Sequence, residues 1–257
     1  MSSGKVYALI QARMSSSRFP GKVIQELASK PMIMFQVNRI LKSRLIDDLY
    51  VLTSTDKSDD ILCEILSKNN IKVFRGTLLN VNERFLTFLK IHTECQVFVR
   101  LTADCPLSCS DIIDNSISTL KENCLDYVSN TLFPTFPHGL DVEVVSRDAF
   151  VTLGNETLNE YQKEHVTPFL YQNPHKFKLG NISNSLNLSR FRCTVDYKKD
   201  FLAITKLVSK NPNLLQEPNF SSLEFTLLSS NNPLEVTEPR KAISKGPWRE
   251  YTFFGKT

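Results

Sequence analysis

Short β-rich runs alternate with amphipathic segments through the first half of the chain, and this alternation constrains the fold more than any other feature. Strands are expected at 5–10, 49–53, 72–74, 96–101 and 126–129, with helices beginning at 31, 58, 80 and 110 between them. Strands that are joined through helices form crossover units, and such units build a mainly parallel sheet. The sequence therefore predicts an α/β protein.

Each of these helices is predicted from apolar residues at helical spacing. The apolar face of the first helix consists of Ile33, Val37, Ile40 and Leu41, and that of the second consists of Ile61, Leu62, Ile65 and Leu66. Ser58, followed by two acids, marks the start of the second helix, and Asn80 with Glu83 resembles a capping box before the third. We expect these apolar faces to be buried.

The regular alternation stops near residue 130. A strand is expected at 139–144, with Asp141 and Glu143 on one face, because successive side chains alternate along a strand. Further helices are expected around Ala149 and at 159–171 and 200–208, and further strands near 177–182 and 191–195. This second part is therefore predicted to be a mixed region.

From residue 211 the sequence loses its regular pattern and becomes rich in Asn, Pro and Ser. We therefore predict a main domain at 1–210 and an appendage at 211–257. Residues 240–257 carry five basic residues against one acid, and they include Trp248, Phe253 and Phe254. The aromatic residues favour docking of this segment onto the main domain over a nucleic-acid-binding tail.

Residues 11–22, with the sequence QARMSSSRFPGK, directly follow the first predicted strand and form a basic loop. Arg13, Arg18 and Lys22 cannot be buried without partners, and the serines at 15–17 and the backbone at Gly21 can surround a polyanion. Neither a Walker loop nor the dinucleotide fingerprint occurs. We interpret the loop as a different kind of nucleoside triphosphate site; the alternative is a solvated surface loop.

Acidic residues follow two of the predicted strands. Asp104 lies just beyond the strand at 96–101, at the carboxyl end where open α/β sheets have their ligand crevice. Asp196 follows the strand predicted at 191–195 in the same way. Carboxylates beside a polyphosphate are the ligands that Mg²⁺ prefers, so a metal ligand is expected at Asp104.

Composition excludes several other classes of protein. Of the 257 residues, 41% are hydrophobic, which is enough for a sizeable core, and the net charge of +4 is not gathered into a basic tract. The apolar runs are too short for a signal peptide or a membrane span, so a soluble cytoplasmic protein is expected. The six cysteines form no Cys-x-x-Cys pair, which favours reduced thiols over zinc or disulfides.

Six motifs, taken in order, resemble the cytidylyltransferases that activate sugars as CMP conjugates. They are QARMSSSRFPGK (11–22), KPM (30–32), TADCPL (102–107), FPHGLDVEV (136–144), EHVTPFLYQNP (164–174) and TVDYKKDF (194–201). The similarity is closest to the branch called spore coat polysaccharide biosynthesis protein F, with acylneuraminate and 3-deoxy-manno-octulosonate cytidylyltransferases as more distant relatives. The order of the six motifs makes the resemblance specific.

The resemblance implies a nucleotide-diphospho-sugar transferase fold: a Rossmann-like, mostly parallel sheet with a small mixed region for sugar binding and dimerisation. It also implies CTP and a sugar as substrates, Mg²⁺ as cofactor, pyrophosphate as product and a homodimer. No nucleic-acid or membrane partner is expected. The sugar is expected to be acidic or to carry a phosphate, and the pathway to be polysaccharide or glycan synthesis.

Site residues follow from the same resemblance, carried onto matching positions. Residues implied to act in catalysis are Arg13, Lys22 and Asp104. Those implied to bind the nucleotide are Gln11, Ala12, Arg13, Arg18, Lys22 and Thr102. Those implied to contact the acceptor are His138, Asp141, Glu143, Glu164 and His165, and the implied Mg²⁺ ligands are Asp104 and Asp196. Two alternatives stay open from the residues alone: Glu143 and Asp141 as a solvated strand face, and His165 as a packed helix histidine.

The chain departs from the family pattern at two places. Ser15 stands where the phosphate loop usually has Gly, and Ala28-Ser29 stand where the next turn usually has Gly-Gly. A side chain where glycine supplied a positive φ would strain the backbone. Two other functions are therefore kept: a catalytically silent nucleotide-binding relative, and a glycosyltransferase on a related fold, although 102–104 lack the usual Asp-x-Asp motif.

Overall fold

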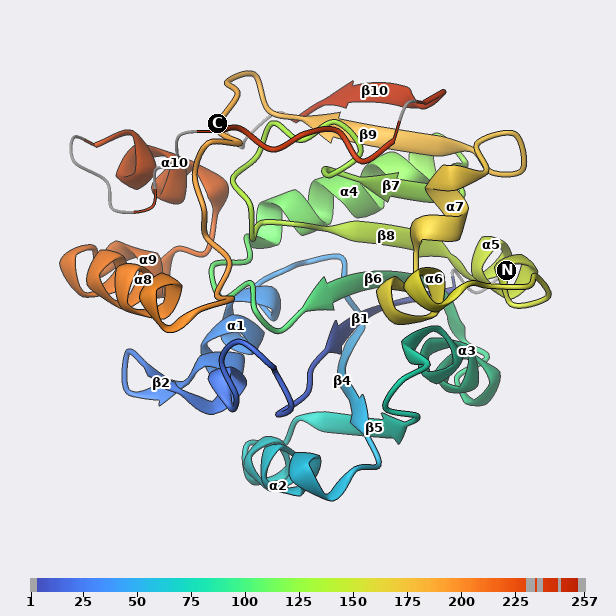
Figure 1. Cartoon of the computed structure of the whole chain (residues 1–257). Helices are drawn as coiled ribbons and strands as arrows, with labels where there is room; N and C mark the ends of the chain where they lie inside the picture. The colour runs from blue at the N-terminus through green and yellow to red at the C-terminus, as the bar shows by residue number, and fades with distance from the viewer. Residues whose placement is uncertain (1–3, 230–233, 235–237, 245, 254–257) are drawn as a thin grey trace.

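A central sheet of eight strands organises the computed structural model, which describes residues 4–229, 234, 238–244 and 246–253 (Figure 1). The strands, in spatial order, are β10 (Arg249–Thr252), β9 (Leu179–Ser183), β7 (Tyr127–Ser129), β8 (Glu143–Ser146), β6 (Cys95–Thr102), β1 (Lys5–Gln11), β4 (Asp48–Ser54) and β5 (Lys72–Gly76). All neighbouring strands are parallel except β8, which runs antiparallel to both β6 and β7. The predicted α/β class and the mainly parallel sheet are confirmed.

Helices cover both faces of the sheet (Figure 1). One face packs against α1 (Met32–Ile40), α2 (Asp60–Lys68), α4 (Ser110–Glu122), α8 (Lys198–Lys210) and α10 (Phe220–Leu228). The other packs against α3 (Val81–Ile91), α5 (Arg147–Leu153) and α7 (Pro168–Gln172). The remaining helical segments are the 3₁₀ turns η1 (Lys22–Ile24) and η2 (Lys57–Asp59) and the short helices α6 (Glu160–His165) and α9 (Asn213–Gln216).

The two-sided cover explains why β1 consists of a continuous apolar run. Val6, Ala8 and Ile10 lie in the core on one face, while Tyr7 and Leu9 lie in the core on the other. A strand that is buried on both faces has no solvent side, so its sequence does not alternate between apolar and polar residues. β1 is therefore fixed at the centre of the sheet, and the basic loop begins where it ends.

Two residues predicted to belong to buried helix faces are exposed. Leu41 is 52% exposed because α1 ends at Ile40 and Leu41 is its C-cap. Ile61 is 48% exposed, since α2 is buried through Leu62 and Leu66 on the neighbouring face. The Asn80 cap of α3 is present: its side chain accepts a hydrogen bond from the Glu83 amide at 3.1 Å.

The strand predicted at 139–144 begins only at Glu143, so the prediction that Asp141 and Glu143 share one strand face is wrong. The side chain of Asn130 donates to the Leu140 carbonyl at 2.8 Å and accepts from the Val142 amide at 2.9 Å. These bonds hold the segment as a loop, because the main-chain groups that a strand would pair are already satisfied.

The strand predicted at 191–195 is also wrong, since within the described residues the segment belongs to no strand of the sheet and forms an isolated bridge between Arg192 and His138. Its amides bond across to loops: Cys193 to the His138 carbonyl at 2.6 Å and Val195 to the Asp104 carbonyl at 2.8 Å. Gly139 (φ +101°) permits this approach, because a Cβ there would lie 2.5 Å from the Cys193 backbone. The segment therefore connects the mixed region to the end of β6.

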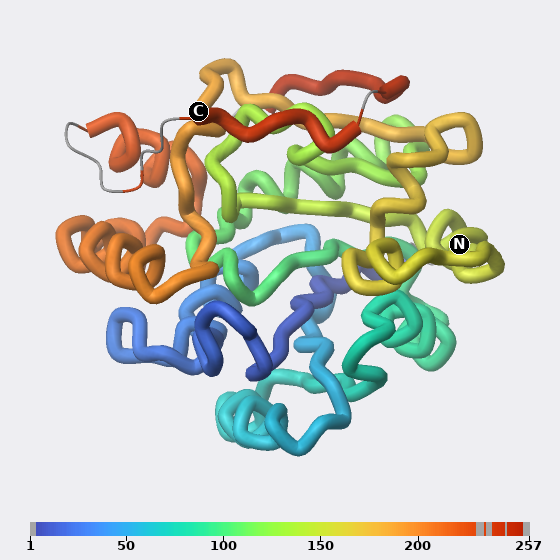
Figure 2. Tube along the Cα trace, in the orientation of Figure 1, coloured from blue at the N-terminus to red at the C-terminus, as the bar shows by residue number. Residues whose placement is uncertain are grey.

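The described part of 211–253 lies in the same sheet and core as the rest of the chain. β10 pairs with β9 along the outer edge, as the end of the tube in Figure 2 shows. Phe253 is buried against Phe136 and Phe220, with ring centroids 5.5 and 5.7 Å away. Trp248 packs against the core on the other face of the sheet, which α3, α5 and α7 cover. Phe254 lies outside the described residues. The boundary at residue 210 stays a prediction.

The hairpin after the basic loop carries the strain that the departure from Gly-Gly predicted. Strands β2 (Glu26–Leu27) and β3 (Lys30–Pro31) are joined by Ala28 (φ 51°) and Ser29 (φ 62°), both in the left-handed region. Two-residue hairpins with two positive φ angles favour Asn and Gly, because a Cβ is disfavoured there. Ser15 is not among the residues with positive φ in the described chain, so its exchange brings no such strain.

We predict that the double substitution Ala28→Gly and Ser29→Gly raises the free energy of unfolding by about 1–2 kcal/mol, because glycine has no Cβ to strain. Urea denaturation followed by circular dichroism measures the change. Ala203→Gly, inside α8, is the matched control and is expected to cost about 1 kcal/mol. A double variant that loses stability as the control does would contradict the strain.

Candidate active site

A cavity of about 260 Å³ opens at the carboxyl ends of β1 and β6. Its walls come from four places: the basic loop 11–22, the loop after β6, the end of α6 and the segment before α8. The cavity therefore lies where an open parallel sheet is expected to bind its ligand. Ten of the residues predicted for the site line it: Gln11, Ala12, Arg13, Arg18, Lys22, Thr102, Asp104, Glu164, His165 and Asp196.

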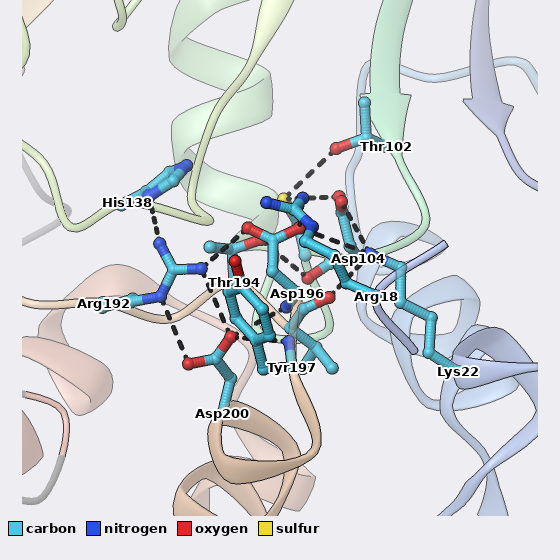
Figure 3. Close-up of polar contacts among 12 residues, drawn as sticks. Arg18, Lys22, Thr102, Asp104, His138, Arg192, Thr194, Asp196, Tyr197 and Asp200 are labelled. Atoms are coloured by element: carbon cyan, nitrogen blue, oxygen red, sulfur yellow. Dashed lines mark hydrogen bonds and ion pairs between the residues drawn. The ribbon is translucent and has the colours of Figure 1, made fainter. Parts of the chain in front are cut away.

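Lys22 lines this cavity, and its ammonium reaches toward Asp104 and Asp196 (Figure 3). Its Nζ donates to the Val195 carbonyl at 2.7 Å and lies 3.1 Å from Asp104 Oδ2 and 3.6 Å from Asp196 Oδ1. The residue is only 8% exposed, and a buried ammonium requires such partners. Burial alone would raise the pKa of Asp104, but the charge of Lys22 and hydrogen bonds from Thr102 and Lys22 outweigh it and lower that pKa.

Asp196 is held by two further cations. Arg18 contacts Oδ1, and Arg192 Nη2 lies 2.7 Å from Oδ2. Asp200 accepts hydrogen bonds from the Asp196 and Tyr197 amides, both at 2.9 Å, and so fixes the turn into α8. Burial lowers the pKa of Arg192, yet hydrogen bonds to both aspartates raise it above its ordinary value. Arg192 and Asp200 were not predicted as site residues from the sequence; the available signal for Asp200 is that it is an acid in the first turn of α8.

The basic loop is anchored from below by Asp59, which is fully buried. Asp59 Oδ1 accepts from the Met14 amide at 2.7 Å, while Oδ2 accepts from Thr53 Oγ1 at 2.9 Å and from both the amide and the hydroxyl of Ser54. The Met14 carbonyl in turn accepts from the amides of residues 16 and 21. The sequence interpretation of Asp59 as a helix-start acid therefore missed its contact with the loop.

Arg100 is a further cation in the cavity wall, and no sequence motif pointed to it. It forms an ion pair with Glu143 and donates to Gln11 Oε1 at 3.0 Å. Glu143 also accepts from Tyr127 OH at 2.7 Å and from the Thr167 hydroxyl. Glu143 therefore lies buried beneath the cavity and orients Arg100, and it is not a solvated strand residue.

Two other residues predicted to contact the acceptor lie outside this cavity. His138 lies in an adjoining hollow, with Nδ1 3.2 Å from Arg192 Nη1 (Figure 3). Asp141 forms an ion pair with Arg240, with one N–O distance of 2.6 Å. The structure thus brings Glu164 and His165 to the cavity and separates them from His138 and Asp141.

The wall formed by α6 carries a group that can exchange protons. Arg13 lies 3.4 Å from Glu164, and the neighbouring His165 ring packs on Tyr161 with the centroids 4.4 Å apart. Burial lowers the pKa of His165, although Glu164 opposes the shift. The imidazole is therefore mainly neutral at pH 7 and can accept a proton.

Comparison with known proteins identifies the family. The family model described as cytidylyltransferase matches residues 7–222, which is most of the chain and extends past residue 210. The chain belongs to the cytidylyltransferase family. It is therefore a nucleotidyltransferase enzyme.

Individual relatives agree with this family. The chain is 30% identical over 237 residues to the spore coat polysaccharide biosynthesis protein SpsF of Bacillus subtilis, covering 90% of this chain and 96% of that one. It is 28% identical over 124 residues to the 3-deoxy-manno-octulosonate cytidylyltransferase of Geobacter sulfurreducens, covering 46% of each.

A solved structure extends the agreement to the fold. A cytidylyltransferase from Leptospira borgpetersenii superposes with a TM-score of 0.85 at 28% identity, covering 93% of this chain and 100% of that one. The fold is that of the nucleotide-diphospho-sugar transferases, as the sequence resemblance implied. Among the described residues, no helix has the length and apolar content to span a membrane.

We predict that Asp59→Asn raises the KM for CTP about tenfold. The NH₂ group of the Asn side chain would face N–H or O–H donors from which the carboxylate now accepts, so the loop would lose its anchor. Steady-state kinetics with varied CTP measures it. Asp56→Asn is the control, because exposed Asp56 contacts only Ser58 through its side chain in the same turn. Lower stability with an unchanged KM would assign Asp59 a purely structural role.

Proposed function

We propose that the chain is a Mg²⁺-dependent cytidylyltransferase that transfers CMP from CTP to a sugar and releases pyrophosphate, for polysaccharide or glycan synthesis. One observation carries the proposal: the Lys22 ammonium lies within 4 Å of two carboxylates, Asp104 and Asp196, beneath a loop that adds Arg13 and Arg18. Phosphoryl-group chemistry depends mainly on positioning and on such charge stabilisation.

The residues present fit a magnesium ion. Mg²⁺ is usually bound by one or two carboxylates together with substrate phosphates and waters, and Asp104 and Asp196 provide two carboxylates at one cavity. The described residues contain no group of three acidic, His or Cys ligands, which disfavours a site built from protein alone. Mg²⁺ held by Asp104 and Asp196 would neutralise charge on the phosphates.

The residues of the chain itself then have separable tasks. Arg13, Arg18 and Lys22 bind the triphosphate and offset the charge that grows on the leaving pyrophosphate. The acceptor oxygen attacks the α-phosphorus in line with that leaving group. His165, neutral and in the cavity wall, accepts the proton of an attacking hydroxyl.

The acceptor is proposed to be an acidic sugar or a sugar phosphate. The side of the cavity formed by α6 has Arg13 and Arg100 close to Glu164 and His165. Arginines recognise carboxylate and phosphate through paired N–H donors, while the Glu164 carboxylate can accept from sugar hydroxyls. The name of the Geobacter relative, which specifies an acidic sugar, supports this class of acceptor.

The assembly is proposed to be a homodimer in the cytoplasm. Sedimentation equilibrium on the full chain is expected to give twice the mass of one chain, and a single-chain mass at all concentrations would reject the dimer.

The reaction is tested by measuring pyrophosphate release with Mg²⁺ for the four ribonucleoside triphosphates and a panel of acidic, phosphorylated and neutral sugars. Release with CTP and one acidic or phosphorylated class is expected. Calorimetry of CTP binding separates the failures: binding without turnover supports the silent relative, whereas the absence of both rejects the nucleotide site.

We predict that Asp104→Asn lowers kcat by about 10²–10³-fold, since one of the two charges that hold Lys22 and the metal is removed. The thermal midpoint is expected to stay within a few degrees of the wild type. Asp48→Asn, at the opposite end of the sheet and paired with Lys72, is the control and should keep its activity. Full activity in the Asp104 variant would exclude the proposed metal site.

A further inference from the structure

A second hollow, of about 510 Å³, lies between α1, the hairpin 26–31 and the residues 215–218 at the end of α9 and just beyond it. Figure 1 shows α9 beside α1 and the hairpin, on the side of the molecule away from α3 and α6. None of its lining residues also lines the cavity around Lys22. The hollow is therefore separate from the active site, and its volume is that of a small-molecule pocket.

Three cations line this hollow, and none of its lining residues is acidic. They are Lys30 in the hairpin and Arg39 and Lys42 at the end of α1. None of the three has a carboxylate partner within ion-pair distance in the part of the chain that the structure describes. The hollow is thus electropositive, in contrast to the cavity around Lys22, where the cations are matched by Asp104 and Asp196.

Arg39 makes this charge a built feature of the hollow. Arg39 is 3% exposed, and among the described residues its guanidinium donates to neutral groups alone, chiefly the carbonyls of Ser108 (2.9 Å) and Leu214. Carbonyls satisfy the donors but leave the net charge in place. The guanidinium also lies 5.9 Å from the centre of the Phe35 ring, which lines the same hollow.

The remaining wall is apolar and open. Leu41 is 52% exposed and Leu215 is 50% exposed, although both are large aliphatic residues, and Pro218 lies beside them. Leu41 is the residue of the predicted apolar face of α1 that the structure leaves exposed. An apolar body would remove these side chains from water, and an anionic group would contact the exposed Lys30 and Lys42 beside the buried charge of Arg39.

We propose that this hollow is a second ligand site, which binds a small anion with an apolar body. Its walls touch both loops of the active site. The hairpin is joined to Lys22 through the turn η1, at the end of which the Gln25 amide donates to the Lys22 carbonyl at 3.2 Å. Arg39 donates to the Ser108 carbonyl and so holds the loop that follows Asp104. A ligand in the hollow therefore contacts elements that position the catalytic groups.

The probe for this site is 1-anilinonaphthalene-8-sulfonate, an aromatic anion whose fluorescence rises in apolar surroundings. Titration of the native full chain is expected to show one saturable site that persists with CTP and Mg²⁺ in excess. N-phenyl-1-naphthylamine, the same body without the sulfonate, should bind about fivefold or more weakly, because it cannot use the cations. Complete displacement by CTP, equal binding of the uncharged probe, or no saturable binding would overturn the proposal.

Substitutions of the lining residues test whether the probe binds in this hollow. Lys30→Ala with Lys42→Ala is expected to weaken sulfonate binding about fivefold or more. Lys68→Ala with Lys121→Ala, two exposed lysines that line neither hollow, changes the net charge equally and should leave binding unchanged. Equal loss in both pairs would show that only net charge is sensed, and would reject the site. Leu215→Ser should weaken both probes.

Discussion

The active site depends on the contacts of the Lys22 ammonium with two carboxylates and a carbonyl. The ammonium joins three pieces of chain that are far apart in sequence: the basic loop, the loop that carries Asp104 and the segment that carries Val195 and Asp196. An ammonium at this depth is stable because two carboxylates and a carbonyl surround it, and the ammonium in turn offsets the negative charge of the two carboxylates. Removal of Lys22 would therefore take away the cation that Asp104 pairs with, whereas Lys22 keeps Asp196 as a partner when Asp104 is replaced.

Three further buried acids support the residues around Lys22. Asp59 holds the basic loop, Asp200 holds the turn at Asp196, and Glu143 holds Arg100. Each accepts several hydrogen bonds from groups that would otherwise move independently, so each converts a flexible segment into a fixed one. The cavity is thus preorganised by carboxylates that do not line it, which is how a loop-built site acquires the precision of a rigid element.

The antiparallel strand β8 explains how the mixed region meets the sheet. It lies between β6 and β7 and places Glu143 opposite Arg100, with the two residues paired in register. The segment 191–195 is not a strand of this sheet, and its amides bond to the carbonyls of His138 and Asp104 instead. This arrangement separates the predicted acceptor residues, since Glu164 and His165 line one hollow, His138 lines the other, and Asp141 and Glu143 line neither.

The sequence by itself determined the α/β class, the strands of the first half and the lining of the cavity by the basic loop and Asp104, because continuous apolar runs and loop composition are local signals. It could not determine that Asp141 and Glu143 part, that Leu41 stays exposed, or that Asp59, Arg100 and two further charged residues serve the site. Those outcomes depend on which distant groups satisfy each charge and each main-chain bond, and only the tertiary structure decides such pairings.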